Sequence, residues 1–434
     1  MKTKLVSDFL VFLRNSPTPY HVAQNLRTML KKAGYEELFE REKWSLKKNG
    51  KYFIIRGGSS LLAFELNNIK ENAGFLAIGA HTDSPCLKLK PNPTKEKFGY
   101  LQLNTEVYGG VLLNPWFDRD LSIAGKVIYK TKSNQIGTTL IDCKKPLAIL
   151  SSLAIHLDRE ANKKRSIDKQ KMLSPILSLP CGEKDFKDLI VSKIANKEKI
   201  EKNFSVLSSD LFLYDTQPPA VTGLNDDFIS SARLDNLVSC YYACRALIDS
   251  KSEYNKLLIC NDHEEVGNQS YIGAKGNFFK DVLGRVYKTP EIYSRVVASS
   301  LLVSADNAHG LHPNFPERHD ENHRPIINSG VVVKINNNQA YASNADTCSI
   351  IENLAEKHKI PVQYFISNNE MPCGSTIGPI TATQIGLRTI DLGVPTFAMH
   401  SIRELCGVKD ISSFYKLLVK AYQEDVKGLY SSLG

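Results

Sequence analysis

The stretch LLICNDHEEVG, residues 257–267, constrains the fold of this chain more than any other. Its apolar first half predicts a buried strand, and the abrupt change to polar residues places the strand's end at the rim of a sheet. Neighbouring side chains on an extended chain point in opposite directions, so Glu264 and Glu265 are expected to have different tasks. One carboxylate can bind a metal while the other acts as general base toward a water on that metal. A solvated turn is the alternative for an isolated pair.

Other stretches place a histidine or a carboxylate directly after small or apolar residues. The apolar run 74–80 predicts a fully buried strand that ends in His81, and Asp83 follows two residues later, where it can orient the imidazole. Asp235 follows a small-residue segment that opens a helix, where it is either a plain helix-start carboxylate or a bridge between two metals. Asp306 and His400 each end an apolar run.

Together these stretches supply two imidazoles and three carboxylates. Such a nitrogen and oxygen set, without a thiolate, suits zinc, manganese or cobalt. If the middle carboxylate bridges, each of two ions receives one histidine and one carboxylate of its own, and Glu264 remains as base. The predicted ligands are His81, Asp235, Glu265, Asp306 and His400.

Composition narrows the class of protein. The chain has 434 residues, 42% of them hydrophobic and 23% charged, which is typical of a soluble protein with two or three domains. The net charge of +9 is spread over lysine-rich segments that are not interleaved with aromatic residues, so nucleic-acid binding is not expected. Nine scattered cysteines indicate reduced thiols and a cytoplasmic protein. No run has the length of a membrane span, so no membrane partner is expected.

The order of patterns predicts two units. Strand-like and helix-like runs alternate in 1–88 and 222–434, which predicts one discontinuous α/β unit whose mixed, mostly parallel sheet has flanking helices. Residues 89–221 carry short alternating runs and are expected to form a β-rich insert with some helix, including Leu147–Leu157. His156, in that helix, is either a structural or a functional histidine.

Two further features allow a structural or a functional interpretation. Lys334 interrupts the apolar run 331–335, where it either protects an edge strand or supplies a cation to a pocket. Gly374 and Ser375 belong to a glycine-rich turn before a helix, which either holds an anion or packs tightly.

Several of these stretches closely resemble the aspartyl aminopeptidase family of dinuclear zinc aminopeptidases. The resemblance extends from about residue 16 to residue 404. Its motifs are GAHTDSP at 79–85, HEEVG at 263–267, SADNAH at 304–309, PCGSTIGP at 372–379 and AMHSIRE at 398–404.

The resemblance implies an α/β zinc-exopeptidase domain interrupted by a dimerisation domain, with dimers assembled into a tetrahedral dodecamer. It implies the metal roles given above. It also implies that His156 reaches a neighbouring subunit's active site, as a substrate contact or a metal ligand, and that Lys334 meets an acidic substrate side chain. Ala340 is a departure, because relatives that prefer acidic residues often carry Arg there, so the preference is expected to be less strict.

The sequence therefore predicts a cytoplasmic metallo-aminopeptidase that uses two divalent ions, zinc first, on peptide substrates. A dinuclear deacylase or carboxypeptidase is the rival enzyme, and the released product separates them. A non-catalytic scaffold or cargo protein is the rival from another class, but it has no need of the ligand set or of Glu264.

Overall fold

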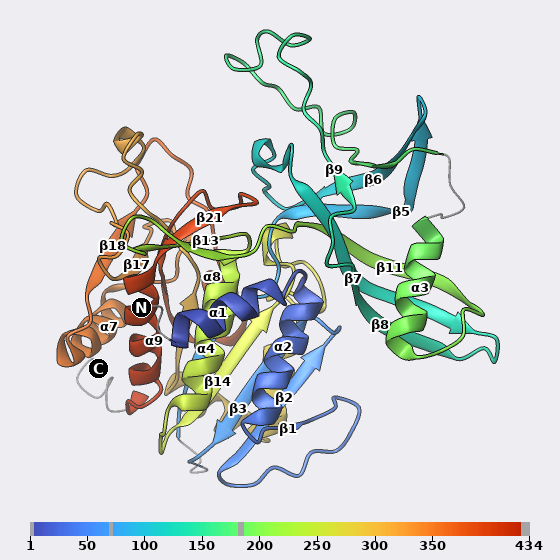
Figure 1. The fold of residues 1–434 in the computed structure, drawn as a ribbon. Helices are drawn as coiled ribbons and strands as arrows, with labels where there is room; N and C mark the ends of the chain where they lie inside the picture. The colour runs from blue at the N-terminus through green and yellow to red at the C-terminus, as the bar shows by residue number, and fades with distance from the viewer. Residues whose placement is uncertain (1–3, 69–72, 181–185, 427–434) are drawn as a thin grey trace.

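A nine-stranded mixed sheet forms the centre of the computed structural model, which describes residues 4–68, 73–180 and 186–426 (Figure 1). Five of the eight pairings between its described strands are parallel, as the predicted fold class requires. In spatial order the strands are β1 (Glu36–Glu37), β2 (Gly50–Arg56), β3 (Ser60–Leu66), β14 (Asn255–Asn261), β4 (Phe75–His81), β15 (Leu301–Ala305), β19 (Arg388–Gly393), β17 (Val331–Ile335) and β18 (Val362–Ile366).

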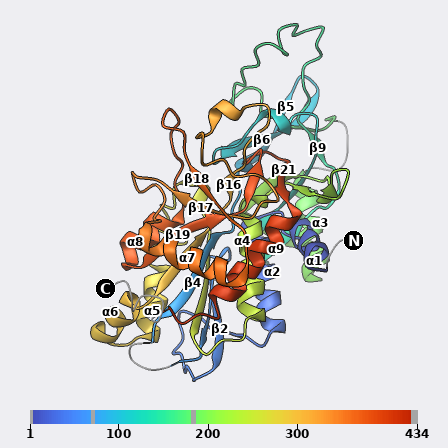
Figure 2. The ribbon, with the colours of Figure 1, turned by 90° about the vertical axis from the view of Figure 1, so that its left-hand side faces the viewer.

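Helices cover both faces of this sheet, because the apolar strands must be buried on both sides. On β4, Leu76 and Ile78 pack into one core, whereas Phe75 and Ala77 pack into the other. The first face carries α1 (Lys4–Arg14), α2 (Pro19–Lys32), α4 (Leu234–Asp249), α7 (Ala345–His358) and α9 (Val408–Ala421). The second face carries α5 (Phe278–Val286), α6 (Pro290–Ala298) and α8 (Ile377–Ile385), on the side away from α2 and α4 in Figure 2.

A second sheet is built from residues 86–215 and has its own core. Its strand order is β11-β5-β6-β10-β9-β7-β8, and an additional β11–β7 pairing closes it into a barrel-like ring. Helix α3 (Phe186–Glu198) packs into this core. The strands are β5 (Cys86–Lys97), β6 (Tyr100–Tyr108), β7 (Asp120–Thr131), β8 (Ile136–Asp142), β9 (Ala148–Ile149), β10 (Ile176–Ser178) and β11 (Phe204–Asp215), with a short η1 helix (Asn114–Trp116) before β7.

A third, five-stranded sheet joins segments that are far apart in the sequence. Its order is β12 (Ala220–Thr222), β13 (Phe228–Ser231), β21 (Glu404–Gly407), β20 (Pro395–Phe397) and β16 (Ala308–His309). The chain enters α4 directly after β13 and reaches His400 directly after β20. This sheet therefore positions two of the predicted ligands.

The predicted helix over 147–157 is wrong. The chain there forms the short strand β9 and then turns, in a segment between β9 and β10 that projects at the top of Figure 1. Leu153 and Leu157 are 60% and 75% exposed, so no other described part of the chain covers the apolar side chains that a helix here would have to bury. Among the described residues, no helix combines the length and apolar character needed to cross a membrane.

Candidate metal centre

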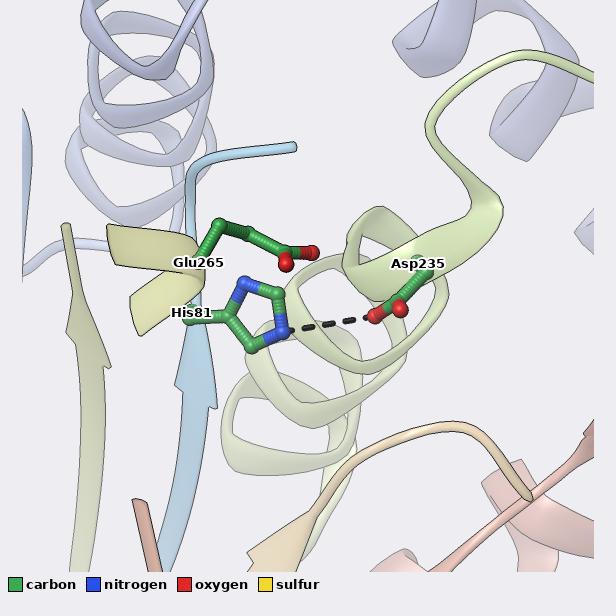
Figure 3. A group of neighbouring side chains, drawn as sticks. All are labelled: His81, Asp235 and Glu265. Carbon is green, nitrogen blue, oxygen red and sulfur yellow. Dashed lines mark ion pairs between the residues drawn. The ribbon is translucent and has the colours of Figure 1, made fainter. Parts of the chain in front are cut away.

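His81 is the last residue of β4, and its side chain is almost fully buried. Its Nδ1 lies 3.1 Å from the carbonyl oxygen of Asp83. Its Nε2 lies 3.3 Å from Oδ1 of Asp235 (Figure 3). The same nitrogen lies 3.5 Å from Oδ1 of Asp306. Because β4 runs parallel to β14 and β15, the carboxyl ends of all three strands meet at this edge of the sheet.

His400 approaches the same carboxylate from the opposite side. Its Nε2 lies 3.4 Å from Oδ2 of Asp235 and 3.3 Å from Oε2 of Glu265. Its Nδ1 lies 3.1 Å from the carbonyl oxygen of Gly110, in the second sheet's segment. The third sheet, and not the central one, positions His400 and Asp235.

Three buried carboxylate oxygens at this centre accept no hydrogen bond in the described part of the chain, although Nε2 of His81 lies close to the two Asp oxygens: Oδ1 of Asp235, Oε1 of Glu265 and Oδ1 of Asp306. A buried carboxylate is costly unless a cation or donor meets it, so these oxygens fit a metal cradle. Ligand atoms of His81, Asp235 and Glu265 all lie within 4.8 Å of one another. This nitrogen and oxygen donor set fits zinc.

The pKa directions show an excess of negative charge. Burial chiefly, together with the nearby carboxylates of Asp306 and Asp83 and against the opposing effect of His81, raises the pKa of Glu264 to about 8. Burial and Asp235 raise the pKa of Glu265 well above its usual value. These buried carboxylates concentrate negative charge at one place, which favours the binding of a cation there.

Glu264 and Glu265 do not continue a strand, which corrects the expectation from extended geometry. Strand β14 ends at Asn261, and both glutamates lie in a single turn of 3₁₀ helix, η2 (Glu264–Val266), after His263 in the left-handed region. Their backbone N–H groups donate to Oδ1 and Oδ2 of Asp83, at 3.2 and 3.1 Å. Three residues per turn still separate the two carboxylates in direction.

A family model described as aminopeptidase I zinc metalloprotease (M18) matches residues 12–422. The chain belongs to this family. A relative from Ectopseudomonas mendocina (strain ymp), named a probable M18 family aminopeptidase 2, is 48% identical over 425 residues, which are 97% of this chain and 99% of the relative. A relative of the same name from Pseudomonas fluorescens (strain SBW25) is 47% identical, with the same coverage of both chains.

Solved structures agree with this assignment. A cryo-EM structure of the Ape4 and Nbr1 complex has a TM-score of 0.94 at 34% identity, over 98% of this chain and 86% of that one. The S. cerevisiae mApe1 dodecamer has a TM-score of 0.85 at 31% identity, over 99% of this chain and 98% of that one. The predicted family, fold class and enzyme class are thereby confirmed: the chain is an M18 zinc aminopeptidase.

In this M18 aminopeptidase, Lys334 lies in an interior strand, because β17 pairs with both β19 and β18. The edge-strand alternative is therefore wrong. Only 1% of the Lys334 side chain is exposed, and its ammonium lies 3.3 Å from Oδ2 of Asp306, donates to the carbonyl of Asn307 at 3.2 Å and lies 5.1 Å from the ring centre of Tyr341. Lys334 thus contacts a candidate ligand directly.

A cavity of about 300 Å³ opens beside the metal centre of the M18 fold. Its lining includes Gly374 and Met399, the neighbour of His400, and it contains no carboxylate among the described residues. Arg318, at the end of the short η3 helix (Pro316–Arg318), gives it a cationic side chain, whereas burial lowers the pKa of His309 and of His319 and so favours their neutral forms. Ser375 stands beside Gly374, but Thr376 itself accepts the Gly378 N–H at the start of α8.

His156 is not brought to the centre by this subunit. It is exposed, in the segment that projects between β9 and β10. No hydrogen bond or ion pair joins it to the candidate ligands within the described ranges.

Two residues at the centre were not predicted from the sequence. Tyr108, from β6 of the second sheet, donates its hydroxyl to Oδ2 of Asp83 at 2.8 Å. Glu404, the first residue of β21, accepts backbone N–H groups of two candidate ligands. Glu404 belongs to the AMHSIRE motif, which was a usable signal, whereas Tyr108 lies in an ordinary alternating strand.

Proposed function

We propose that this chain is a two-zinc aminopeptidase that removes amino-terminal residues from peptides, with a preference for Asp and Glu. One observation carries the proposal: the two imidazoles face opposite oxygens of Asp235, His81 with Asp306 on one side and His400 with Glu265 on the other. That arrangement provides one ion site on each side of a shared carboxylate. Manganese and cobalt can use the same donors, but the family is described as a zinc metalloprotease, so zinc is proposed first.

Bound there, zinc supplies a Lewis acid and acidifies water at neutral pH. The chain's own residues supply proton transfer and orientation. Glu264 is assigned the role of accepting a proton from the attacking water and delivering it to the leaving amine. Asp83 orients the ring of His81 and holds the turn that carries Glu264.

The preference for acidic residues rests on the cations near the cavity. Arg318 lines the cavity, and Lys334 lies behind the cavity-lining ring of Tyr341. An Asp or Glu side chain meets no carboxylate in the lining. Gly374 lines the cavity, and we assign it and the adjacent Ser375 to binding of the substrate. Ala340, where relatives that prefer acidic residues often carry Arg, is expected to relax the preference.

We further propose that residues 1–88 and 222–434 form the catalytic unit and that 89–221 joins subunits in a homo-oligomer. The projecting segment exposes Leu153, Ile155 and Leu157, as a subunit contact would require. The similar S. cerevisiae structure is a dodecamer. In such an assembly His156 completes a neighbouring subunit's site. The eight cysteines in the described residues are free, which supports a cytoplasmic location.

The test of the activity is a panel of peptides that differ in the first residue, incubated with zinc-loaded protein and followed by identification of the released amino acid. A freed amino-terminal residue supports the proposal, and a freed carboxyl-terminal residue or acyl group contradicts it. Glu264→Gln keeps the size and hydrogen bonding of the base but cannot accept a proton. Its turnover should fall by ~10²-fold or more at unchanged metal content.

The test of specificity is the ratio of kcat/KM for Glu- and Leu-terminated peptides. The wild type should favour Glu, and Lys334→Met and Arg318→Met should each lower the ratio. If the wild type favours Leu, or if neither variant changes the ratio, the acidic preference is wrong, while the metal-dependent activity stands.

A further inference from the structure

Glu404 lies beneath the metal centre with 2% of its side chain exposed. Oε1 accepts the backbone N–H of His400 at 2.8 Å, and Oε2 accepts the backbone N–H of Asp235 at 3.0 Å. Each carboxylate oxygen therefore holds the main chain of one candidate ligand. None of the roles assigned above includes this residue.

The two ligands that Glu404 joins come from different elements. Asp235 stands near the start of α4, after β13, and His400 stands in the turn after β20. Strand β21 pairs with both β13 and β20, and Glu404 is the direct register partner of Ser231. Glu404 thus sits where the two ligand-bearing segments meet, and it is the side chain that ties both to one point.

We propose that Glu404 is a positioning residue that sets the separation of Asp235 and His400, and so determines how tightly the ion between them is held. The role is that of an outer partner that orients ligands without touching the metal. It rests on the metal assignment of the proposed function and is independent of the peptide preference.

The contact requires a carboxylate of this length. A carboxylate offers two acceptor oxygens, whereas the amide of Gln offers one oxygen and one NH₂ group. In Glu404→Gln, one backbone N–H would face a donor and remain buried without a partner. Asp, shorter by one methylene, cannot reach both N–H groups at once. The ligand that loses its partner gains freedom to move.

Asp410 provides a matched control. It is also buried, and its two oxygens accept the backbone N–H groups of Asn328 at 2.6 Å and Gly330 at 2.8 Å. Neither partner is a candidate ligand. Asp410→Asn therefore makes the same chemical change, one N–H left facing an NH₂ group, at a place that does not touch the metal centre.

The experiment compares full-length wild type, Glu404→Gln and Asp410→Asn, each first stripped of metal. Zinc is titrated back against a competing chelator, and the melting temperature of the metal-free form is measured in parallel. We expect the Kd of the ion held between Asp235 and His400 to rise ~10–100-fold in Glu404→Gln, which is the usual cost of losing an outer partner. The Kd of the other ion should be nearly unchanged. Asp410→Asn should bind both ions as the wild type does, although its metal-free melting temperature falls by a similar amount.

Three outcomes decide the matter. Wild-type zinc affinity in Glu404→Gln, or an equal loss in Asp410→Asn, overturns the positioning role. If the wild-type protein binds fewer than two ions, the two-zinc proposal itself is wrong. This result is distinguishable from the two results above because it appears in the wild type and not in a variant. If Glu404→Gln does not fold, Glu404→Asp is titrated in the same way, because this variant keeps the negative charge but is too short to accept both backbone N–H groups. The same rise in Kd supports the positioning role, and a wild-type Kd overturns it.

Discussion

His81 and His400 face the same carboxylate, but their surroundings differ. His81 ends an interior strand of the nine-stranded sheet, and only 2% of its side chain is exposed. The His400 side chain is 32% exposed and stands in a turn between the third sheet and Gly110 of the second sheet's segment. One end of the centre is therefore formed with the protein core, whereas the other depends on the correct meeting of three sheets.

The largest difference is expected when each imidazole is removed. In metal-free protein, His81→Ala leaves the buried carboxylates of Asp235 and Asp306 without their imidazole partner, which should cost about 3–5 kcal/mol of unfolding free energy. His400→Ala removes a ring that is a third exposed, and should cost about 1 kcal/mol. Urea unfolding in the presence of a chelator measures both. Equal losses would show that the two ends are equally part of the core.

Metal removal should separate the ends in time. With excess chelator, zinc is expected to leave in two phases, because the more exposed His400 end opens to solvent more readily. In His400→Ala the fast phase should disappear and the slow phase should remain. Stopped-flow detection of released zinc follows both. A single phase in the wild type, or loss of the slow phase in the variant, would reverse the order proposed for the two ends.

The stability of the metal-free protein should depend on pH through His81 more than through His400. Burial acts to lower the pKa of His81, but the carboxylates of Asp235, Asp306 and Asp83 outweigh burial and raise it well above its usual value. The protonated imidazole therefore stabilises the fold below the unfolded pKa of about 6.5, and this contribution is lost as pH rises through the higher folded value.

His81→Gln should flatten that alkaline decline in unfolding free energy. Burial acts to lower the pKa of His400, but Asp235 outweighs it and raises this pKa, though by less than the pKa of His81 is raised. His400→Gln should therefore flatten the decline less. Denaturant unfolding of chelated protein across neutral and alkaline pH provides the comparison. Identical pH profiles for the two variants would contradict it.

The smallest effect concerns the second sheet's support of the His81 end. Tyr108→Phe removes one hydrogen bond to Asp83, which retains its contacts with the N–H groups of Glu264 and Glu265. The expected loss is about 1 kcal/mol of unfolding free energy, with turnover lowered less than ~10-fold. Tyr415→Phe, which removes a Tyr–Asp hydrogen bond to Asp249 at the end of α4 away from Asp235, is the control and should leave turnover unchanged.

The sequence predicted which candidate ligands gather at the His81 end, because each follows a buried strand whose apolar run is visible without the structure. His81 and Asp306 illustrate this: parallel strands bring their carboxyl ends to one edge. The prediction weakened where contacts depend on register between distant segments. Glu404 meets Asp235 only because β21 pairs with β13, and no local pattern encodes that pairing.

Local patterns also misled where tertiary context prevailed. The run 147–157 resembles a helix, but its first part forms the short strand β9, and its second part, with the exposed Leu153 and Leu157, projects from the fold. Lys334 resembles an edge-strand lysine, but Asp306 and the Asn307 carbonyl allow its ammonium to be buried. A single stretch does not reveal which elements surround it, so it predicted a helix that does not form and left two interpretations of Lys334 open.

The account depends most on Asp235, the one carboxylate shared by both ends. The direct measurement is zinc stoichiometry, by metal analysis after exhaustive dialysis, in wild type and in Asp235→Ala protein whose fold is verified by circular dichroism. The account predicts two zinc ions per wild-type chain and loss of tight binding at both ends in the variant. Two tightly held ions in Asp235→Ala would contradict it.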